Sequence, residues 1–525
     1  MPVKCLVKKN EYRDSTFLMR IRDHVKALEG INEAAVLMAT ESNKQLVKDI
    51  GLLSKEMNSA SSNDLLIVVK GTEGAIKRAF RIIEDLLTQK ESLFAEKHYR
   101  TLDSALSDLP DANLAVISIP GQFASREVRK ALNRNLNVFL FSDNVPIEDE
   151  LQLKLLAKEK NLLLMGPGCG TAIINNVGLG FSNSVNKGKI GVVASSGTGI
   201  QEFSVLVHRL NSGISHAIGV GSRDLSSAIG GLMTKYGLNL LENDGSTKVI
   251  VLISKQSSED VLKDVVRYVR RFKKPVIVDF IGDDSSWVIE YGIVSASTLE
   301  DAAIKAVALE RGISERGVRL PFKVDTMKSI VGAEISKLSN RQKFVRGLFS
   351  GGALCRESLS VLSRYLGHVY SNVPLSKELK LADSRFSKGH TCVDLGEEEF
   401  TAGKAHPMID FDIRCRRILQ ESMDERVAVI LFDIILGYGC NMNPASVLIP
   451  IIKQAKSNAL KRGQSISFVA SICGTEKDPQ NIVEQERRLN EVGVVLTYSN
   501  AQASKLAALI ASKGTFNEVF REYGA

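Results

Sequence analysis

The sequence predicts an α/β protein built on parallel sheets, preceded by a small α+β domain. From about residue 97, short apolar segments alternate with amphipathic helical patterns, as where "NLAVISIPG" precedes "QFASREVRKALNRN". Such alternation is typical of parallel sheets with helices on both faces. Several apolar segments also end in small-residue turns that open helices, as in "VVASSGTGIQEF". Ligands of open parallel sheets bind at such strand ends, so these turns are the first candidates for a site.

Four domains and a connector follow from the order of the patterns. The first segment reads strand, helix, strand, then strand and helix after a polar stretch, which predicts a ferredoxin-like module with an interaction or regulatory role. The later segments each repeat strand and helix. The expected boundaries are 1–95 for this module, 96–186 for a Rossmann-like domain, 187–312 for a flavodoxin-like domain, 313–342 for the connector and 343–525 for a second flavodoxin-like domain.

Composition narrows the class of protein. The 525 residues are 44% apolar and 24% charged, with a net charge of +8, ordinary values for a globular protein. We expect a cytoplasmic protein without a membrane span, because no apolar run spans a bilayer and the N-terminus lacks a signal-peptide core. Seven scattered cysteines without a CxxC pair suggest neither zinc nor disulfides. With 6% aromatic residues and no basic-aromatic stripe, nucleic acid is not an expected partner.

Small-residue turns are the candidate anion sites. A helix N-terminus offers unpaired amides and the positive end of the helix dipole, and glycine lets an anion approach. Each such turn alone is equally compatible with simple packing. No P-loop and no G-x-G-x-x-G fingerprint is present, which favours a small phosphate group over a nucleotide. The candidate phosphate ligands are Ser195, Ser196, Gly197 and Thr198 in one turn and Gly437, Gly439, Cys440 and Asn441 in another, before Asn443 and Pro444.

Several motifs carry a family resemblance. "LLLMGPGCGTAIINN" and "GKIGVVASSGTGIQEF" resemble the α subunit of succinyl-CoA synthetase, and "KFVRGLFSGGALCRESL" and "VAVILFDIILGYGCNMNPAS" resemble the C-terminal domain of its β subunit. With "FSDNV" and "KAHPMID", the chain is identified as a member of the FdrA family. The resemblance implies a CoA-binding Rossmann domain, two flavodoxin-like ligase domains, and a phosphate between two facing helix N-termini. By motif these helices begin at Ser195–Thr198 and Gly437–Asn443.

The chain departs from the synthetases in ways that bear on activity. A synthetase needs a histidine that carries phosphate, yet no histidine lies between Arg223 and Arg341, and Lys255 and Gln256 stand near the place of its supporting glutamate. An ATP-grasp domain and the N-terminal CoA loop are also missing. The resemblance to the FdrA family therefore implies transfer between carbamoyl phosphate and oxamate in allantoin breakdown, with companion subunits in an oligomer. No cofactor or metal is required, and CoA stays a candidate ligand.

Other residues are weighed individually. The loop "GKAHPMID" places Lys404, His406 and Asp410 together, which suggests a carboxylate site or a general acid or base, or else a packed loop. Arg223 and Asp224 form either a substrate clamp or a surface ion pair. Lys255 ends a strand near the expected anion. Gly351 and Gly352 are expected to contact substrate, as are Arg223, Asp224 and Lys255.

Two other functions remain open. In one, the chain is an acyl-CoA synthetase subunit whose phosphohistidine and ATP-grasp domain belong to another chain, and CoA-dependent thioester formation distinguishes it. In the other, it is a non-catalytic scaffold or regulatory subunit. For the main hypothesis, transfer rests on electrostatic stabilisation of the leaving phosphate and on positioning.

Overall fold

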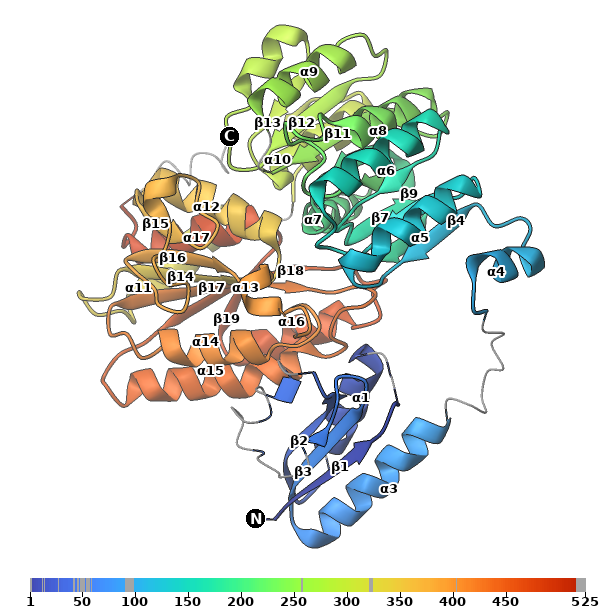
Figure 1. The fold of residues 1–525 in the computed structure, drawn as a ribbon. Helices are drawn as coiled ribbons and strands as arrows, with labels where there is room; N and C mark the ends of the chain where they lie inside the picture. The colour runs from blue at the N-terminus through green and yellow to red at the C-terminus, as the bar shows by residue number, and fades with distance from the viewer. Residues whose placement is uncertain are drawn as a thin grey trace. The chain divides into compact units, whose positions relative to one another are not determined.

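The predicted fold class is confirmed: the chain combines a small α+β unit with parallel-sheet α/β layers (Figure 1). The computed structural model describes residues 2–11, 13, 15–26, 28–40, 43–44, 47, 52, 57, 59–89, 99–255, 258–320, 324–402 and 404–515. Two compact units are present. The N-terminal unit comprises Met1–Ala105 and Glu398–Ala405, and the large unit comprises Leu106–Glu397 and His406–Ala525.

The N-terminal unit is a three-stranded antiparallel sheet with helices α1 and α3. Its strands lie in the order β1-β3-β2. Both faces of the central strand are buried, because Leu65, Ile67 and Val69 pack with the two helices while Leu66 and Val68 pack in a second cluster. The elements are β1 (Val3–Lys8), α1 (Ser15–Lys26), β2 (Ile31–Met38), β3 (Leu65–Gly71) and α3 (Glu73–Gln89), the order that the sequence predicts.

The large unit begins with a short parallel sheet of order β4-β5-β6. The predicted turn at Pro120 and Gly121 opens α5, as expected. Gly121 has no room for a side chain, because an added Cβ would lie 2.1 Å from the Asp143 carbonyl oxygen. The elements are α4 (Leu102–Asp108), β4 (Leu114–Ile117), α5 (Gly121–Asn133), β5 (Asn137–Leu140), α6 (Ile147–Glu159) and β6 (Leu164–Met165).

The second sheet has seven strands in the order β13-β12-β11-β9-β10-β7-β8. Its two last strands form an antiparallel hairpin that the sequence analysis did not predict; Asn175 and Asn176, both with positive φ, make the turn. The hairpin precedes residue 187, the expected start of the first flavodoxin-like domain, but it pairs with β10 of that domain. The predicted domain boundaries stay predictions. The strands are β7 (Thr171–Ile174), β8 (Val177–Gly180), β9 (Lys187–Ala194), β10 (Ile214–Gly219), β11 (Val249–Ser254), β12 (Val276–Phe280) and β13 (Val294–Ala296).

Helices cover both faces of this sheet. Helices α7 and α10 pack together on one face, and α8 and α9 pack together on the other (Figure 1). The apolar strands explain this arrangement, since all six residues of β11 are buried. The helices are α7 (Gly197–Arg209), α8 (Leu232–Asn243), α9 (Glu259–Val269), η2 (Ser286–Tyr291), α10 (Leu299–Arg311) and η3 (Glu315–Gly317). The next helix, α11 (Val324–Ile335), packs on α17 (Asn500–Ala511) instead.

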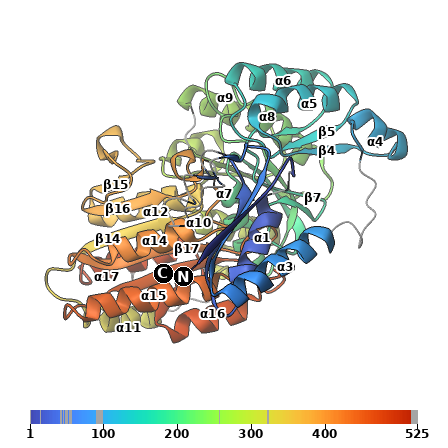
Figure 2. The ribbon, with the colours of Figure 1, turned by 60° about the horizontal axis from the view of Figure 1, so that its bottom comes forward.

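The third sheet is fully parallel, in the order β15-β16-β14-β17-β18-β19. Helices α12 and α17 lie on one face, and α14 and α15 on the other (Figure 1); α15 and α16 lie side by side in Figure 2 as well. The elements are β14 (Phe344–Phe349), α12 (Gly352–Leu366), β15 (Val369–Ser371), η4 (Lys377–Leu379), β16 (His390–Asp394), α13 (Glu398–Thr401), α14 (Asp412–Glu421), β17 (Val427–Ile435), α15 (Pro444–Leu460), β18 (Ser467–Cys473), α16 (Ile482–Glu491), β19 (Val494–Thr497) and α17 (Asn500–Ala511).

In each of the two large sheets, the strand order reverses at the strand that precedes the first helix. In the second sheet, β9 lies between β10 and β11; in the third, β14 lies between β16 and β17. Helices α7 and α12 begin at these two strand ends and pack against each other. The points where parallel sheets reverse order form crevices that bind ligands, so the two helix starts mark the candidate site.

Candidate functional site

The start of α7 presents unpaired amides and hydroxyl groups, as predicted. The Ser196 side chain caps the helix by accepting a hydrogen bond from Gly199 N at 3.3 Å. This leaves the amides of Gly197 and Thr198 without an acceptor inside the helix. Ser195 Oγ accepts a hydrogen bond from Lys255 N at 3.2 Å, which joins the ends of β9 and β11. The turn is thus preorganised for an anion.

The start of α12 faces the start of α7. Ala353 N donates to Thr198 Oγ1 at 3.3 Å. A Cβ added to Gly351 would lie 3.1 Å from Thr198 Cβ, so glycine permits the close approach of the two helices. The positive ends of two helix dipoles therefore meet at one point.

The predicted pairing of Ser195–Thr198 with Gly437–Asn443 stays a prediction. The Gly437–Asn443 turn packs on an earlier segment, because Tyr438 N donates to Ser182 O at 2.8 Å. It opens α15, whose helix neighbours are α14 and α16. The contact between the starts of α7 and α12 was not predicted from the motifs.

The Gly437–Asn443 turn supports a neighbouring loop. Asn441 N donates to Met408 O at 2.9 Å, and Asn441 Nδ2 donates to Ile409 O at 3.0 Å. A Cβ added to Gly439 would lie 2.9 Å from the Phe181 ring. The glycines of this turn therefore serve close packing against Phe181 and Ser182, and Asn441 bonds the loop that carries His406. Burial raises the pKa of the Cys440 thiol to about 12, which leaves little thiolate.

Lys255 and Asp394 lie on either side of Gly352. A Cβ on this glycine would lie 2.7 Å from Asp394 Oδ2 and 2.8 Å from Lys255 Nζ. The Asp394 side chain is buried at the end of β16, where Asp394 pairs in register with Phe349. Burial raises the pKa of Asp394 to about 7, against the opposing effect of Lys255. Asp394, which exchanges its proton near pH 7, and the cation of Lys255 therefore both lie close to the start of α12.

His406 joins this group as a hydrogen-bond donor. Its Nδ1 accepts from Met408 N at 3.3 Å, so the neutral ring carries its proton on Nε2. Burial, together with the charge of Arg414, lowers the pKa of His406 to about 4, which keeps the ring neutral at pH 7. The Nε2 atom lies 2.8 Å from a Cβ built on Gly396, and the same point is 3.1 Å from Asp394 Oδ1. A neutral Nε2–H donor is neither a base nor a phosphate acceptor at that nitrogen.

A buried ion pair holds the start of α12. Asp433 accepts hydrogen bonds from Ser350 N at 2.9 Å and from Gly351 N at 2.8 Å. Arg414 NH2 donates to Asp433 Oδ1 at 2.6 Å, and both side chains are fully buried. A buried carboxylate of this kind fixes the helix start, and the arginine balances its charge.

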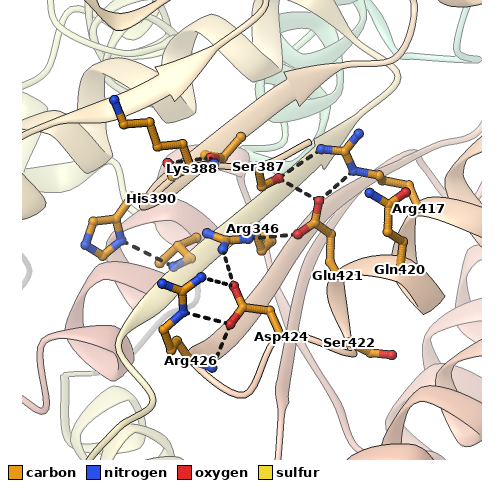
Figure 3. Close-up of polar contacts among 12 residues, drawn as sticks. Arg346, Ser387, Lys388, His390, Arg417, Gln420, Glu421, Ser422, Asp424 and Arg426 are labelled. Carbon is orange, nitrogen blue, oxygen red and sulfur yellow. Dashed lines mark hydrogen bonds and ion pairs between the residues drawn. The ribbon is translucent and has the colours of Figure 1, made fainter. Parts of the chain in front are cut away.

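A second ionic network fixes α14, which carries Arg414 (Figure 3). Glu421 accepts from Arg346 Nε at 2.8 Å and from Arg417 Nε at 2.6 Å. Arg346 NH2 also donates to Asp424 Oδ2 at 2.9 Å. Since Arg346 belongs to β14, the network ties α14 to the strand that ends at the candidate site.

Other predicted residues have different surroundings. Asp224 is fully buried and accepts from Lys154 Nζ at 2.8 Å and from Thr234 N at 2.8 Å. Arg223 forms an ion pair with Glu150 at 2.7 Å. The predicted clamp is therefore corrected, because these groups join α6 to the segment around α8 instead of presenting a free carboxylate and guanidinium.

The remaining residues of the predicted loop are less informative. Asp410 Oδ1 accepts from Asp412 N at 3.0 Å, at the beginning of α14. Lys404 is an exposed residue of the 398–405 segment, which belongs to the N-terminal unit, so its role stays a prediction. Gln256 lies outside the described residues.

The sequence analysis missed Asp394 and Asp433, and it did not predict the pairing of Arg414 with Asp433. The signal for Asp394 was present, since "TCVDLG" places a carboxylate at the end of an apolar strand. Asp433 lies within the buried strand β17 and Arg414 within a helix. Their pairing is a long-range contact that no local pattern reveals.

Comparisons with known proteins first define a class. Residues 348–510 match the family model described as CoA-ligase, and residues 1–100 match the model described as AllF, heavy metal-associated domain. The succinate–CoA ligase subunit alpha 2 of Archaeoglobus fulgidus is 29% identical over 171 residues, which are 32% of this chain and 58% of that protein. The C-terminal part is therefore of the CoA-ligase type.

A full-length relative then gives the family. The protein YahF of Escherichia coli, described as uncharacterized, is 43% identical over 517 residues, 98% of this chain and 99% of YahF. The chain belongs to the same family as YahF. A dinucleotide-forming acetyl-coenzyme A synthetase of Ca. Korarchaeum cryptofilum aligns over 82% of this chain and 88% of its own, with 18% identity and a TM-score of 0.34.

The described residues offer no group of side chains suited to a metal ion. Cys5 is the single cysteine in residues 1–100, the range matched by the heavy metal-associated model. Within the described ranges, no three His, Cys, Asp or Glu side chains are grouped as metal ligands would be.

None of the helices that the structure describes is both long and apolar enough to cross a bilayer.

Proposed function

We propose that the chain is the acyl-transfer subunit of a CoA-ligase-type enzyme, and that an acyl phosphate lies between the starts of α7 and α12. The observation that carries this proposal is the meeting of these two helix starts beside Lys255, whose Nζ lies 2.8 Å from a Cβ built on Gly352. Two helix dipoles and a cation at one point favour a phosphate dianion. The match of residues 348–510 to the CoA-ligase model supports the class of reaction.

In the proposed reaction, a nucleophile attacks the acyl carbon, the carbon–oxygen bond to phosphate breaks, and phosphate leaves with the bonding electrons. The amides of Gly197 and Thr198 and the Lys255 side chain stabilise the charge that grows on the phosphate. The Nε2–H of His406 donates to the acyl oxygen. Asp394 takes the proton of the nucleophile, a role that suits a pKa of about 7.

The thiol of CoA is the first candidate nucleophile, which makes the product a thioester. The proposed binding domain is the Rossmann-like segment 96–186. This chain has no phosphate-carrying histidine between Arg223 and Arg341, and the His406 ring is protonated at Nε2 because Nδ1 accepts from Met408 N at 3.3 Å. The acyl phosphate is therefore supplied from solution or by a companion chain.

Oxamate is the second candidate nucleophile. Carbamoyl phosphate is itself an acyl phosphate, so its use needs no phosphohistidine, and the absence of that histidine favours this alternative. The nitrogen of oxamate would attack the carbamoyl carbon to give oxalurate and phosphate. The FdrA resemblance supports this reading, including allantoin breakdown in the cytoplasm with companion subunits in an oligomer.

The test is phosphate release by the chain purified with its natural partners. One reaction contains acetyl phosphate or succinyl phosphate with CoA, and the other carbamoyl phosphate with oxamate. CoA-dependent release with thioester formation supports ligase-type transfer, whereas oxamate-dependent release supports carbamoyl transfer. Release in neither reaction would count against the acyl-phosphate proposal.

Ser196→Asp supplies a matched test of the site. Aspartate also caps helices, so the variant keeps the bond to Gly199 while placing a negative charge beside the anion. Ser196→Asn is the neutral control of similar shape. We expect loss of phosphate release in Ser196→Asp and retention in Ser196→Asn, and full activity of Ser196→Asp would remove this turn from the site.

A further inference from the structure

A cavity lies apart from the starts of α7 and α12, between α10, the second half of α12 and the start of α17. Its volume is about 500 Å³, within the range of small-molecule sites. The walls come from the start of α10, the segment after η3, the second half of α12 and the start of α17. Ile304, Val318, Leu320, Val361 and Tyr365 supply its apolar surface.

Four cationic side chains line this cavity from three different segments. Arg316 and Arg319 follow α10, Arg364 belongs to α12 and Lys505 to α17. Arg316 and Arg364 make no ion pair within the described part of the chain. Arg316 and Arg364 are therefore available to an anionic ligand.

Glu300 and Asp301, two of the three acidic residues that line the cavity, accept hydrogen bonds from neighbouring residues. Glu300 accepts from Gln502 Nε2 at 3.0 Å and also from Ser499 Oγ. Asp301 accepts from Ser297 N at 2.9 Å and from Lys305 Nζ at 2.9 Å. Glu315, an exposed residue, is the third acidic group of the wall.

Two helix starts point backbone amides to the same cavity. Thr298 caps α10 by accepting from Asp301 N at 3.1 Å, and Ser499 caps α17 by accepting from Gln502 N at 3.1 Å. In each helix the second amide, at Glu300 and at Ala501, has no acceptor within the described ranges, and both residues line the cavity. Each helix thus has one amide left for a ligand.

The first amides of the same helices connect the cavity to the candidate site. Leu299 N at the start of α10 donates to Glu357 Oε1 of α12 at 2.8 Å. Asn500 N at the start of α17 donates to Glu202 Oε1 of α7 at 3.0 Å. Glu202 and Glu357 are each the sixth residue of a helix whose first residues form the candidate site. The two hydrogen bonds are equivalent, one from each large sheet.

We propose that this cavity binds an organic phosphate the size of a nucleoside monophosphate, and that it is a second site whose occupant steadies α7 and α12. The phosphate lies against Arg316, Arg364 and the amides of Glu300 and Ala501. The rest of the molecule packs on Val361 and Tyr365. Because the ligand contacts α10, α12 and α17 together, it holds the two large sheets in one arrangement.

The experiment is calorimetric titration of the full chain with AMP and with ribose 5-phosphate at fixed ionic strength, with adenosine as the uncharged control. We expect one phosphate-bearing molecule to bind per chain and adenosine to bind at least tenfold more weakly. Arg364→Ala and Arg316→Ala should each weaken binding about tenfold or more. Arg385→Ala is the matched control, because Arg385 is an exposed arginine outside the cavity, and it should bind like the wild type.

The outcomes separate this proposal from the proposed function. Calorimetry measures the binding of AMP without any chemical reaction. Ser196→Asp should leave the affinity for AMP unchanged although it abolishes phosphate release. Absence of binding of both phosphates at millimolar concentration would overturn the proposal. Equal affinity in the wild type, Arg364→Ala and Arg316→Ala would also overturn it, since the phosphate would then lie elsewhere.

Discussion

Replacing Asp433 by asparagine tests whether the buried ion pair maintains the start of α12. The wild-type carboxylate accepts from Ser350 N, from Gly351 N and from Arg414 NH2, and the Arg414 side chain has no exposure to solvent. Asparagine has one acceptor oxygen and leaves the arginine charge without its partner. Breaking one side of a buried pair costs about 3–5 kcal/mol, so the free energy of unfolding should fall by that amount.

The assay is urea unfolding followed by near-ultraviolet circular dichroism, which reports on packing in the large unit. Asp383→Asn is the control, because the Asp383 and Arg385 pair is exposed and should contribute little. The double variant Asp433→Asn with Arg414→Met removes the buried charge and should recover most of the lost stability without recovering activity. An Asp433→Asn variant as stable as the control would refute the role assigned to this pair.

Lys255→Met should abolish phosphate release while leaving the fold intact, because Lys255 Nζ is placed to balance the charge of the phosphate; release at the wild-type rate would exclude the residue. His406→Gln, which keeps an N–H donor, should retain more activity than His406→Ala, and equal activities would exclude donation by this ring. Burial raises the pKa of Asp394 to about 7, above its value in the unfolded chain. Between about pH 4 and pH 7 this carboxyl therefore takes up a proton when the protein folds. The free energy of unfolding should consequently fall as the pH rises from about 4 to 7. Asp394→Asn should reduce the dependence of the free energy of unfolding on pH by about 1.4 kcal/mol per pH unit, measured by urea titrations. Glu357→Gln should have the same effect, because Glu357 is another buried carboxyl with a pKa of about 7. An unchanged pH dependence in either variant would contradict the raised pKa of that carboxyl. Glu421→Gln should lower the free energy of unfolding by about 3–5 kcal/mol, since Arg417 loses its carboxylate partner and Arg346 loses one of two. An unchanged urea midpoint would contradict that estimate.

The strand and helix order was predictable because local patterns determine it. Apolar segments alternate with amphipathic ones from residue 97 onward, and the small-residue turns before α5, α7, α12 and α15 each open a helix. The hairpin of β7 and β8 was missed because its signal is a two-residue asparagine turn in a segment to which no strand was assigned.

The candidate site was only partly predictable. Ser196, Lys255 and His406 stand at turns and strand ends, where sequence patterns point to ligands. The contact between the starts of α7 and α12 was not predicted, because the hydrogen bond from Ala353 N to Thr198 joins residues 155 positions apart in the chain. Asp433 was missed for the same reason, since its function depends on a helix start far away in sequence.

The most direct test of the central claim is binding of inorganic phosphate, measured by calorimetry for the wild type, Ser196→Asp and Ser196→Asn in an Arg364→Ala background that weakens the second cavity. An anion held between the starts of α7 and α12 predicts binding in the parent and in Ser196→Asn, with at least a tenfold loss in Ser196→Asp. Equal affinity in all three would place the anion elsewhere and contradict the account of the site.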